Sequence, residues 1–227
     1  MDKDYSQSKD LAKENPKKLA ELKALFDKEA TENLVYPIGA SMYTIFFSPS
    51  ELPSSPLTEW SFYEGQERIP EAMAPKFANG RSTLAVIDAD IGKDAEGVLF
   101  ALGGISSGFT VYMDKGFLKA EYNAMTLNRY KIASESAIPA GKVKIEVETM
   151  YDSTERMAPA TVTLTVNGKQ VGQGRIERSV PCGHTASETF DVGKDLGSPV
   201  ALDYYDRAPF ALNGKIEKIH ISYIAAK

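Results

Sequence analysis

Apolar and polar residues alternate with a period of two over much of this chain, and this pattern constrains the fold more than any other feature. The run Val143–Glu148 alternates valine and isoleucine with lysine and glutamate, and the run Thr161–Val166 alternates threonine with valine and leucine. Successive side chains of a strand point to opposite faces of a sheet. Both runs are therefore expected to be strands with one buried face and one solvated face.

Turn signals separate the strand candidates. Asn167-Gly168 is typical of a tight hairpin, because both central positions of such a turn need a positive φ, and Asp114-Lys115-Gly116 is expected to close a second hairpin. Further strand candidates are Leu84–Ala89, Val98–Leu102, Phe109–Met113, Phe117–Asn123, Leu127–Ile132, Val171–Glu177, Glu188–Val192 and Ile216–Ile224. This pattern predicts a mainly β fold: an antiparallel two-sheet β-sandwich of jelly-roll type, like concanavalin A and laminin G domains, preceded by an N-terminal α-helix.

The N-terminal part of the chain has a helical period instead. Asn15-Pro16 is typical of a helix start, since Asn is a good N-cap and Pro at the first helical position loses no hydrogen bond. Five apolar residues follow at helical spacing and form one stripe: Leu19, Leu22, Leu25, Phe26 and Ala30. A lone amphipathic helix has to bury its stripe. We expect this helix to dock on the sandwich, to pair with a second copy of the chain in a homo-oligomer, or to stay mobile.

The segment Ser48–Pro56 marks the expected domain boundary, because its three prolines exclude regular structure. Residues 1–47 are expected to form a terminal helix and strand segment. Residues 48–80 are expected to be a linker and irregular chain with a short strand at Trp60–Tyr63. The period of two begins at Arg81, so residues 81–227 are the expected β-sandwich.

Charge and composition exclude several classes of protein. A net charge of −5 argues against a nucleic-acid binder, which needs a basic patch to displace counterions. No stretch is apolar for long enough to cross a membrane, and Met1–Tyr5 lacks the apolar core of a signal peptide. A soluble protein is expected, either cytoplasmic or exported with a longer parent. The single cysteine, Cys182, excludes an internal disulfide.

Catalytic motifs are weak. Cys182-Gly183-His184 contains a thiol and an imidazole, but residues two apart need not face each other and no acid lies beside them. We expect a loop with a small buried thiol there. One cysteine and two histidines do not supply a convincing zinc ligand set.

Acidic and aromatic residues offer two kinds of binding site. Four aspartates precede the final strand and are candidate calcium ligands, because calcium prefers hard oxygen donors: Asp191, Asp195, Asp203 and Asp206. A second acidic group, at Asp88–Glu96, is an alternative calcium site. Tyr204 and Tyr205 are candidate ligand-binding residues, since a tyrosine ring can stack on a sugar and its hydroxyl can form hydrogen bonds.

The segment Asp4–Leu19 resembles the end of the catalytic domain of type I sulfatases, where a helix follows an Asp-Leu-Ala and an Asn-Pro pair and ends here near Leu34–Pro37. Later patches are similar, in the right order, to the C-terminal region of large bacterial arylsulfatases. These patches are Arg68–Glu71, Glu96–Leu99, Gly108–Tyr112, Val166–Lys169, Thr189–Gly193 and Gly197–Val200. The resemblance covers nearly the whole chain.

The residues that give sulfatases their activity have no counterpart. That family uses a Cys or Ser in the motif C/S-x-P-x-R, matured to formylglycine, beside a calcium ion. Cys182–Ala186 lacks the Pro and the Arg, and Ser54–Thr58 has Thr where the Arg belongs. The resemblance thus implies a chain that begins downstream of the catalytic site, with Met1 an added or internal start, and no catalytic residue of its own.

Two functions are consistent with these observations. The first is the C-terminal accessory domain of an arylsulfatase-like sulfuric ester hydrolase, whose partner is the sulfatase catalytic domain of the parent. The alternative is a stand-alone lectin-like carbohydrate-binding module. One form of this hypothesis makes sugar binding dependent on calcium. A stand-alone sandwich enzyme is disfavoured because nucleophile, acid and base are all missing.

Overall fold

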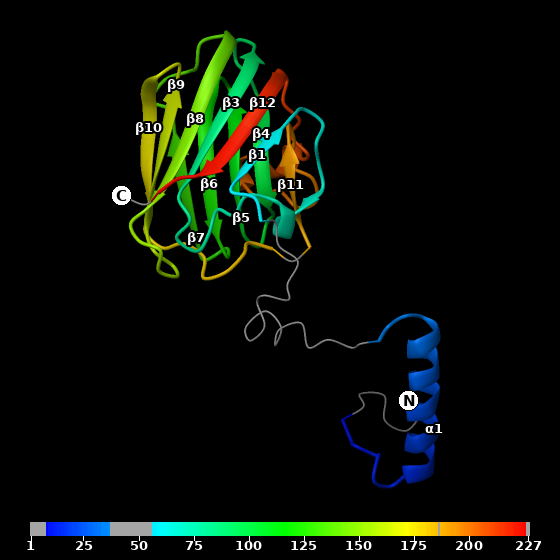
Figure 1. Cartoon of the computed structure of the whole chain (residues 1–227). Coiled ribbons are helices and arrows are strands. Elements are labelled where there is room, and N and C mark those ends of the chain that lie inside the picture. Colours follow the sequence, from blue (N-terminus) through cyan, green and yellow to red (C-terminus); the bar gives the residue numbers. More distant parts are fainter. Residues whose placement is uncertain (1–7, 37–55, 186, 226–227) are drawn as a thin grey trace. The chain divides into compact units, whose positions relative to one another are not determined.

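The computed structural model describes residues 8–36, 56–185 and 187–225. The chain divides into two compact units, Met1–Pro53 and Ser54–Lys227, and we describe each separately (Figure 1). Most of the segment Ser48–Pro56 and the strand expected before it lie outside the described residues. No helix in the described part of the chain is long and apolar enough to span a membrane.

The first unit contains the helix α1 (Pro16–Glu32), which begins at the predicted proline. Asn15 precedes it but makes no side-chain capping hydrogen bond. Its side-chain Nδ2 instead donates to the carbonyl of Leu11 at 3.2 Å. Along α1 itself, Ala30 alone is buried. Leu22, Leu25 and Phe26 each keep about half of their surface exposed, at 50%, 51% and 51%.

The second unit is a β-sandwich of two antiparallel six-stranded sheets, as the sequence predicts (Figure 1). The strands of sheet A, in spatial order, are β1 (Glu59–Phe62), β12 (Lys215–Tyr223), β3 (Thr83–Ile91), β8 (Gly141–Tyr151), β9 (Ala160–Val166) and β10 (Lys169–Ile176). Those of sheet B are β2 (Ile69–Pro70), β11 (Thr189–Val192), β4 (Gly97–Gly103), β5 (Gly108–Asp114), β6 (Phe117–Ala124) and β7 (Asn128–Ala133). Two short 3-10 helices complete the unit, η2 (Glu71–Met73) and η3 (Leu202–Arg207).

The alternating runs form the strands they predict. In β8, buried residues alternate with partly or fully exposed ones, and β9 repeats the pattern beside it. Asn167 and Gly168 connect β9 to β10 with positive φ angles of 50° and 77°, as the hairpin signal predicts. The expected boundary at Arg81 is too late, because β1 pairs with β12 and β2 pairs with β11. These strands have only four and two residues, too few to show a period in the sequence.

The main core lies between the sheets and is rich in aromatic rings. Phe100 stacks on Phe77 and Phe190, with ring centroids 5.7 Å apart in both pairs, and Phe109 packs against Phe77 at 4.9 Å. Full burial of a side chain of this size contributes about 1.5–3 kcal/mol to the stability of the fold. These rings pack against the inner face of sheet B, so contacts outside the main core can form only on the outer face of that sheet.

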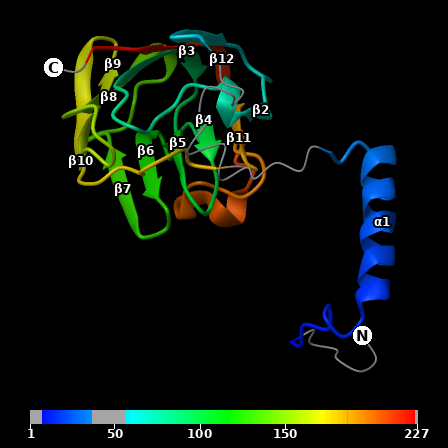
Figure 2. The same ribbon diagram turned by 60° about the horizontal axis from the view of Figure 1, so that its bottom comes forward.

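A second, smaller apolar cluster covers part of the outer face of sheet B. It joins Val98, Ala101 and Tyr112 of the sheet to residues of the segment before β12: Val200, Ala201, Tyr204 and Phe210. Figure 2 shows this segment in orange, with the short helix η3 next to sheet B. The segment therefore forms a third layer over β4 and β5 and brings η3 to the sheet surface.

Candidate functional site

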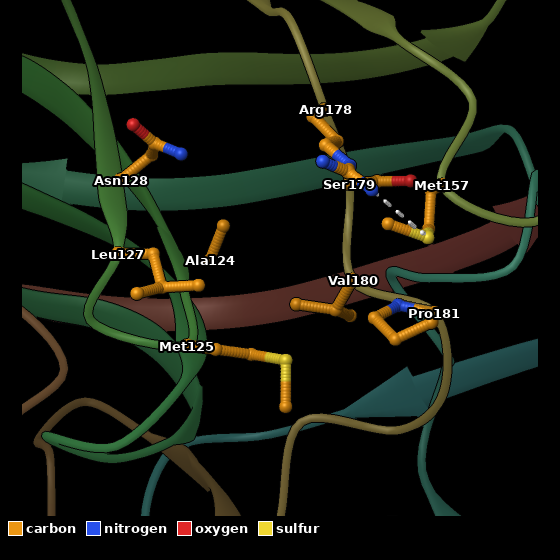
Figure 3. Close-up of a pocket in the computed structure, with 9 residues that line it drawn as sticks. All are labelled: Ala124, Met125, Leu127, Asn128, Met157, Arg178, Ser179, Val180 and Pro181. Carbon is orange, nitrogen blue, oxygen red and sulfur yellow. Dashed lines mark hydrogen bonds between the residues drawn. The ribbon is translucent and has the colours of Figure 1, made fainter.

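A shallow groove lies between the β6–β7 turn and the segment 178–181 (Figure 3). It has a volume of about 190 Å³ and is lined by Ala124, Met125, Leu127, Asn128, Met157, Arg178, Ser179, Val180 and Pro181. Leu127 is 82% exposed at its edge. The lining is mostly apolar, so the groove does not suit a ligand that binds through many hydrogen bonds.

The segment over sheet B is held by backbone hydrogen bonds at both ends. The Val98 amide donates to the Phe210 carbonyl, and the Leu212 amide donates to the Gly193 carbonyl, each at 2.9 Å. Inside the layer, the ring of Tyr204 stacks on Phe210 and meets Tyr112 edge to face, with centroids 5.0 and 5.1 Å apart. These contacts position η3 on the strands.

The carboxyl of Asp195 connects two parts of this layer through hydrogen bonds. Its Oδ2 accepts a hydrogen bond from the Tyr204 hydroxyl at 2.5 Å and one from the Val200 amide at 2.8 Å. Its Oδ1 is buried without a hydrogen-bond partner among the described residues. Burial raises the pKa of Asp195 to about 7, because the hydrogen bonds from Tyr204 and Val200 offset only part of the desolvation.

Beyond η3, charged residues of alternating sign cross β5, β6 and β7. Lys131 Nζ lies 2.5 Å from Asp203 Oδ1, and Lys119 Nζ lies 3.7 Å from Asp203 Oδ2. The Tyr112 hydroxyl donates to Asp203 Oδ2 at 3.0 Å. Lys119 also pairs with Asp114 at 2.7 Å, and Arg207 pairs with the same aspartate at 3.1 Å. We call Lys119, Lys131, Asp203, Asp114 and Arg207 the charged row.

Asp203 is ionised in this setting. Burial alone would raise the pKa of its carboxyl, but the hydrogen bonds from Lys131 and Tyr112 and the positive charges of Lys131 and Lys119 outweigh burial and lower it. The pKa of Asp114 is lowered in the same way, by Lys119 and Arg207 against burial. Both aspartates therefore act as hydrogen-bond acceptors at neutral pH.

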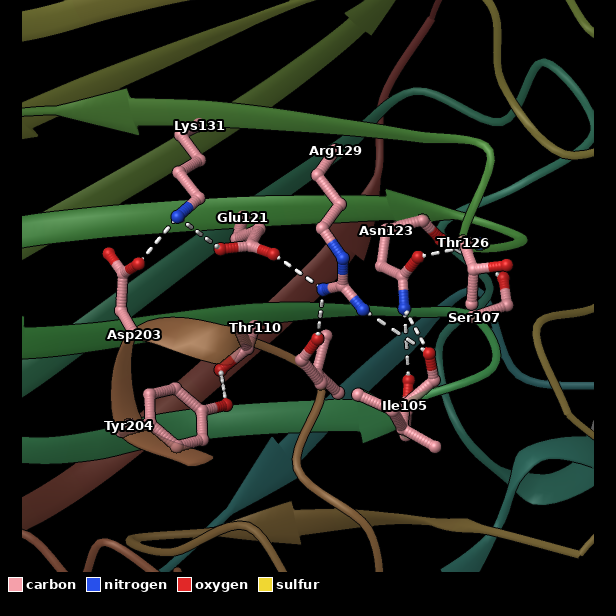
Figure 4. Close-up of polar contacts among 12 residues, drawn as sticks. Ile105, Ser107, Thr110, Glu121, Asn123, Thr126, Arg129, Lys131, Asp203 and Tyr204 are labelled. Carbon is pink, nitrogen blue, oxygen red and sulfur yellow. Dashed lines mark hydrogen bonds and ion pairs between the residues drawn. The ribbon is translucent and has the colours of Figure 1, made fainter. Parts of the chain in front are cut away.

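Below the charged row lies a buried carboxyl, Glu121, which is fully inaccessible to solvent. Arg129 Nη1 lies 2.7 Å from its Oε1, and Lys131 Nζ lies 3.7 Å from its Oε2 (Figure 4). Burial raises the pKa of Glu121, and the hydrogen bond from Arg129 offsets part of that rise. Glu121 thus fixes Lys131 from beneath while Asp203 fixes it from the side.

Arg129 also holds the segment before β12, and Asn123 holds the loop between β4 and β5. Arg129 Nη1 donates to the Val200 carbonyl at 2.6 Å, and Asn123 Nδ2 donates to the Ile105 carbonyl at 2.9 Å (Figure 4). The Asn123 Oδ1 accepts from the Thr126 amide in the next turn at 3.0 Å. The inner half of this polar network is therefore structural, and only its outer half can meet a ligand.

The accessible half offers fixed donors and acceptors with balanced charge. The side chain of Lys131 is 48% exposed and that of Asp203 is 27% exposed. Tyr205, on η3 with Asp203, is 54% exposed. Such an array can hydrogen-bond adjacent hydroxyl groups, while an exposed ring can cover an apolar sugar face.

The four aspartates predicted as calcium ligands have separate environments. Asp191 accepts from the Arg68 amide at 2.6 Å, Asp195 is buried under Tyr204, and Asp203 belongs to the charged row. Asp206 is exposed on η3. Over residues 8–36, 56–185 and 187–225, no three histidine, cysteine or acidic side chains come together in a way that could hold a metal ion. Calcium binding by this chain stays a prediction.

The two predicted tyrosines differ sharply in burial. Tyr204 is fully buried, because its ring forms the centre of the outer cluster, so it cannot present that ring to a ligand. Its neighbour Tyr205 is not part of this cluster and is exposed. Lys119, Lys131 and Glu121, which build the site with Asp203, were not singled out by the sequence, because β6 and β7 pair only in the folded sheet.

Cys182 and His184 also differ from expectation. Cys182 is an exposed thiol, not the buried one predicted, and His184 is buried instead. The imidazole Nδ1 lies 2.9 Å from Ser107 Oγ, and Nε2 lies 3.3 Å from the Phe77 carbonyl oxygen. Burial lowers the pKa of His184 to about 4. Both ring nitrogens are thus committed inside the sandwich and do not serve Cys182.

Many solved structures are similar to this chain, among them laminin and sialidase domains. Domains LG4-5 of the mouse laminin alpha1 chain share 12% identity over 73% of this chain with a TM-score of 0.45, and the match spans 42% of the laminin chain. The CBM40 of Ruminococcus gnavus IT-sialidase shares 13% identity over 73% of this chain and 94% of its own, with a TM-score of 0.45. The same CBM40 bound to alpha2,6 sialyllactose shares 14% identity over 70% of this chain and 93% of its own, with a TM-score of 0.41. At these values the similarities carry no argument about ligand or activity.

No family model and no curated protein matches the chain. The similarity of its sequence to the C-terminal region of arylsulfatases therefore stays a prediction.

Proposed function

We propose that this chain is a carbohydrate-binding module and that its site is the charged row on the outer face of sheet B, flanked by Tyr205. The observation that carries this proposal is the Lys131–Asp203 pair. Its two members come from β7 and η3, are held from below by Glu121 and Tyr112, and remain partly exposed. Donors and acceptors held by their neighbours bind a ligand without first being ordered.

Charge favours a neutral glycan as the ligand. Each cation of this row is paired with a carboxylate: Lys119, Lys131 and Arg207. The row therefore has no unpaired positive charge to bind an acidic sugar. The whole chain carries a net charge of −5, which also disfavours sulfated or sialylated chains. The hydroxyls of a neutral sugar can accept from a lysine and donate to an aspartate at the same time.

Binding to a panel of neutral gluco-, galacto- and manno-oligosaccharides, with sialylated and sulfated counterparts, tests this proposal. We expect at least one neutral oligosaccharide to bind, and calorimetry to show that Lys131→Ala and Tyr205→Ala each weaken binding at least about tenfold, since each removes a direct contact. Lys142→Ala is the control, because Lys142 forms an ion pair with Glu217 on sheet A at 3.0 Å, where the side chains are more exposed, at 76% and 45%.

Two results would contradict the proposal. The first is the absence of binding to every member of the panel by a folded chain. The second is binding that Lys131→Ala and Lys142→Ala affect equally. Thermal unfolding of each variant shows whether a loss of binding reflects a loss of fold.

The accessory role implied by the sulfatase resemblance is a separate proposal. The sandwich has its own core, as a domain appended to a catalytic domain needs. The chain alone would then not hydrolyse sulfate esters, and an assay with an aryl sulfate and calcium tests this directly. Turnover at the rate of a sulfatase would contradict the accessory role and leave the sugar-binding proposal untouched.

A further inference from the structure

The helix α1 carries an apolar face that the first unit covers only in part. The segment after α1 folds back at one end: the Val35 amide donates to the Ala30 carbonyl at 2.8 Å, and the ring of Tyr36 meets that of Phe26 edge to face at 6.3 Å. This contact explains why Ala30 is buried. Leu22 and Leu25 remain half-exposed toward the other end of the stripe.

The charges of α1 are arranged against its own dipole. Lys17 and Lys18 lie in the first turn, where the helix carries partial positive charge, and Glu29 and Glu32 lie in the last turn, where it carries partial negative charge. The first turn contains no acidic residue and the last turn no basic one. This pattern destabilises the helix alone and indicates that each end meets opposite charge from elsewhere.

We propose that α1 pairs with α1 of a second copy of the chain in antiparallel orientation, through Leu22, Leu25 and Phe26. Antiparallel pairing places the basic end of each helix beside the acidic end of the other. It also aligns the two dipoles favourably. A second copy supplies both complementary ends at once, and that is why the charge pattern favours it over an unrelated partner.

The positions of Lys18 and Glu29 fit this arrangement. They are separated by about three helical turns, so they lie on the same side of α1 and at opposite ends of the apolar face. Within one helix Lys18 contacts Glu21 at 2.6 Å, on the exposed surface. In the antiparallel pair Lys18 would approach Glu29 of the other copy, whereas in a parallel pair it would approach a second Lys18.

Sedimentation equilibrium of the full chain over a range of concentrations measures the pairing. We expect a monomer–dimer equilibrium, and Leu22→Glu should weaken it at least about tenfold, because it places a charge in the apolar contact. The matched control is Ala24→Glu, which adds the same charge on the opposite side of α1 and should leave the dimer intact.

Charge reversal tests the orientation. Lys18→Glu and Glu29→Lys should each weaken the dimer, and a mixture of the two variants should form heterodimers, because each restores the pairing that the other lacks. A chain that stays monomeric at all concentrations would overturn the proposal and leave the face to another protein domain. A dimer that survives Leu22→Glu would overturn it as well, since another surface would then join the copies.

Discussion

Single buried groups set the pH dependence of this fold, and His184 is the clearest of them. Its pKa is about 4 in the folded chain, because burial disfavours the charged ring, against about 6.5 in the unfolded chain. Between these values only the unfolded chain takes up the proton. The free energy of unfolding should therefore fall as the pH is lowered from 6.5 to 4, by about 3 kcal/mol in total.

Urea unfolding at pH 7 and pH 4.5 measures this effect as the difference between the wild type and His184→Gln. His220→Gln is the control, because His220 is partly exposed and lies 3.2 Å from Ser61 Oγ at the surface. An equal acid sensitivity of the wild type and His184→Gln would show that His184 does not cause it.

The titration of Asp195 should change the free energy of unfolding with pH in the opposite direction. Its folded pKa of about 7 exceeds the unfolded value of about 3.9, so the folded chain holds the proton more tightly and loses stability as the pH rises from 4 to 7. Asp195→Asn keeps an oxygen that accepts from Tyr204 and Val200 but carries no charge. We expect this variant to be more stable than the wild type at pH 8, by up to about 4 kcal/mol, and the difference to shrink toward pH 4. A constant difference across this range would contradict the assignment.

The contrast between Tyr204 and Tyr205 shows what residue types reveal by themselves. Both were reasonable sugar-binding candidates, because their chemistry is the same. Only the packing of η3 on sheet B separates them, since Tyr204 meets Tyr112 and Phe210 while Tyr205 faces outward. Such a distinction depends on contacts between segments far apart in the sequence.

At the scale of elements, β4 and the segment before β12 are joined by a close backbone approach at Gly97. Gly97 has a φ of +121°, and a Cβ there would lie 2.2 Å from Leu212 Cα. We expect Gly97→Ala to destabilise the fold by about 3 kcal/mol or more, through backbone strain and overlap. Gly92→Ala is the control, because a Cβ there meets nothing within 4 Å. Thermal unfolding checks both, and equal melting temperatures would contradict this account.

The sequence predicted elements well where they are long and half-buried. The strands β8 and β9 follow directly from alternation, because one face of each packs in the core. In β4 and β5 every residue is buried, since η3 and its segment cover the outer face of sheet B, so these strands show no alternation. β1 and β2 are defined by their partners and not by a pattern of their own.

At the scale of the whole molecule, the candidate site combines three segments that only the folded sandwich brings together. Lys119 comes from β6, Lys131 from β7 and Asp203 from η3. The sequence predicted the fold class and pointed to Asp203, but as a calcium ligand. The lysines that pair with Asp203 gave no signal, because scattered lysines are ordinary on a solvated strand face.

The most direct test of the sugar-binding account is an NMR titration of the ¹⁵N-labelled full chain with the neutral oligosaccharide that binds most tightly in the panel. Amide shifts should concentrate at Lys119, Lys131 and Asp203 to Tyr205, on the outer face of sheet B, and Lys142 on sheet A should stay unperturbed. Shifts confined to sheet A or to the groove beside Leu127, or no shifts with any oligosaccharide of the panel, would contradict it.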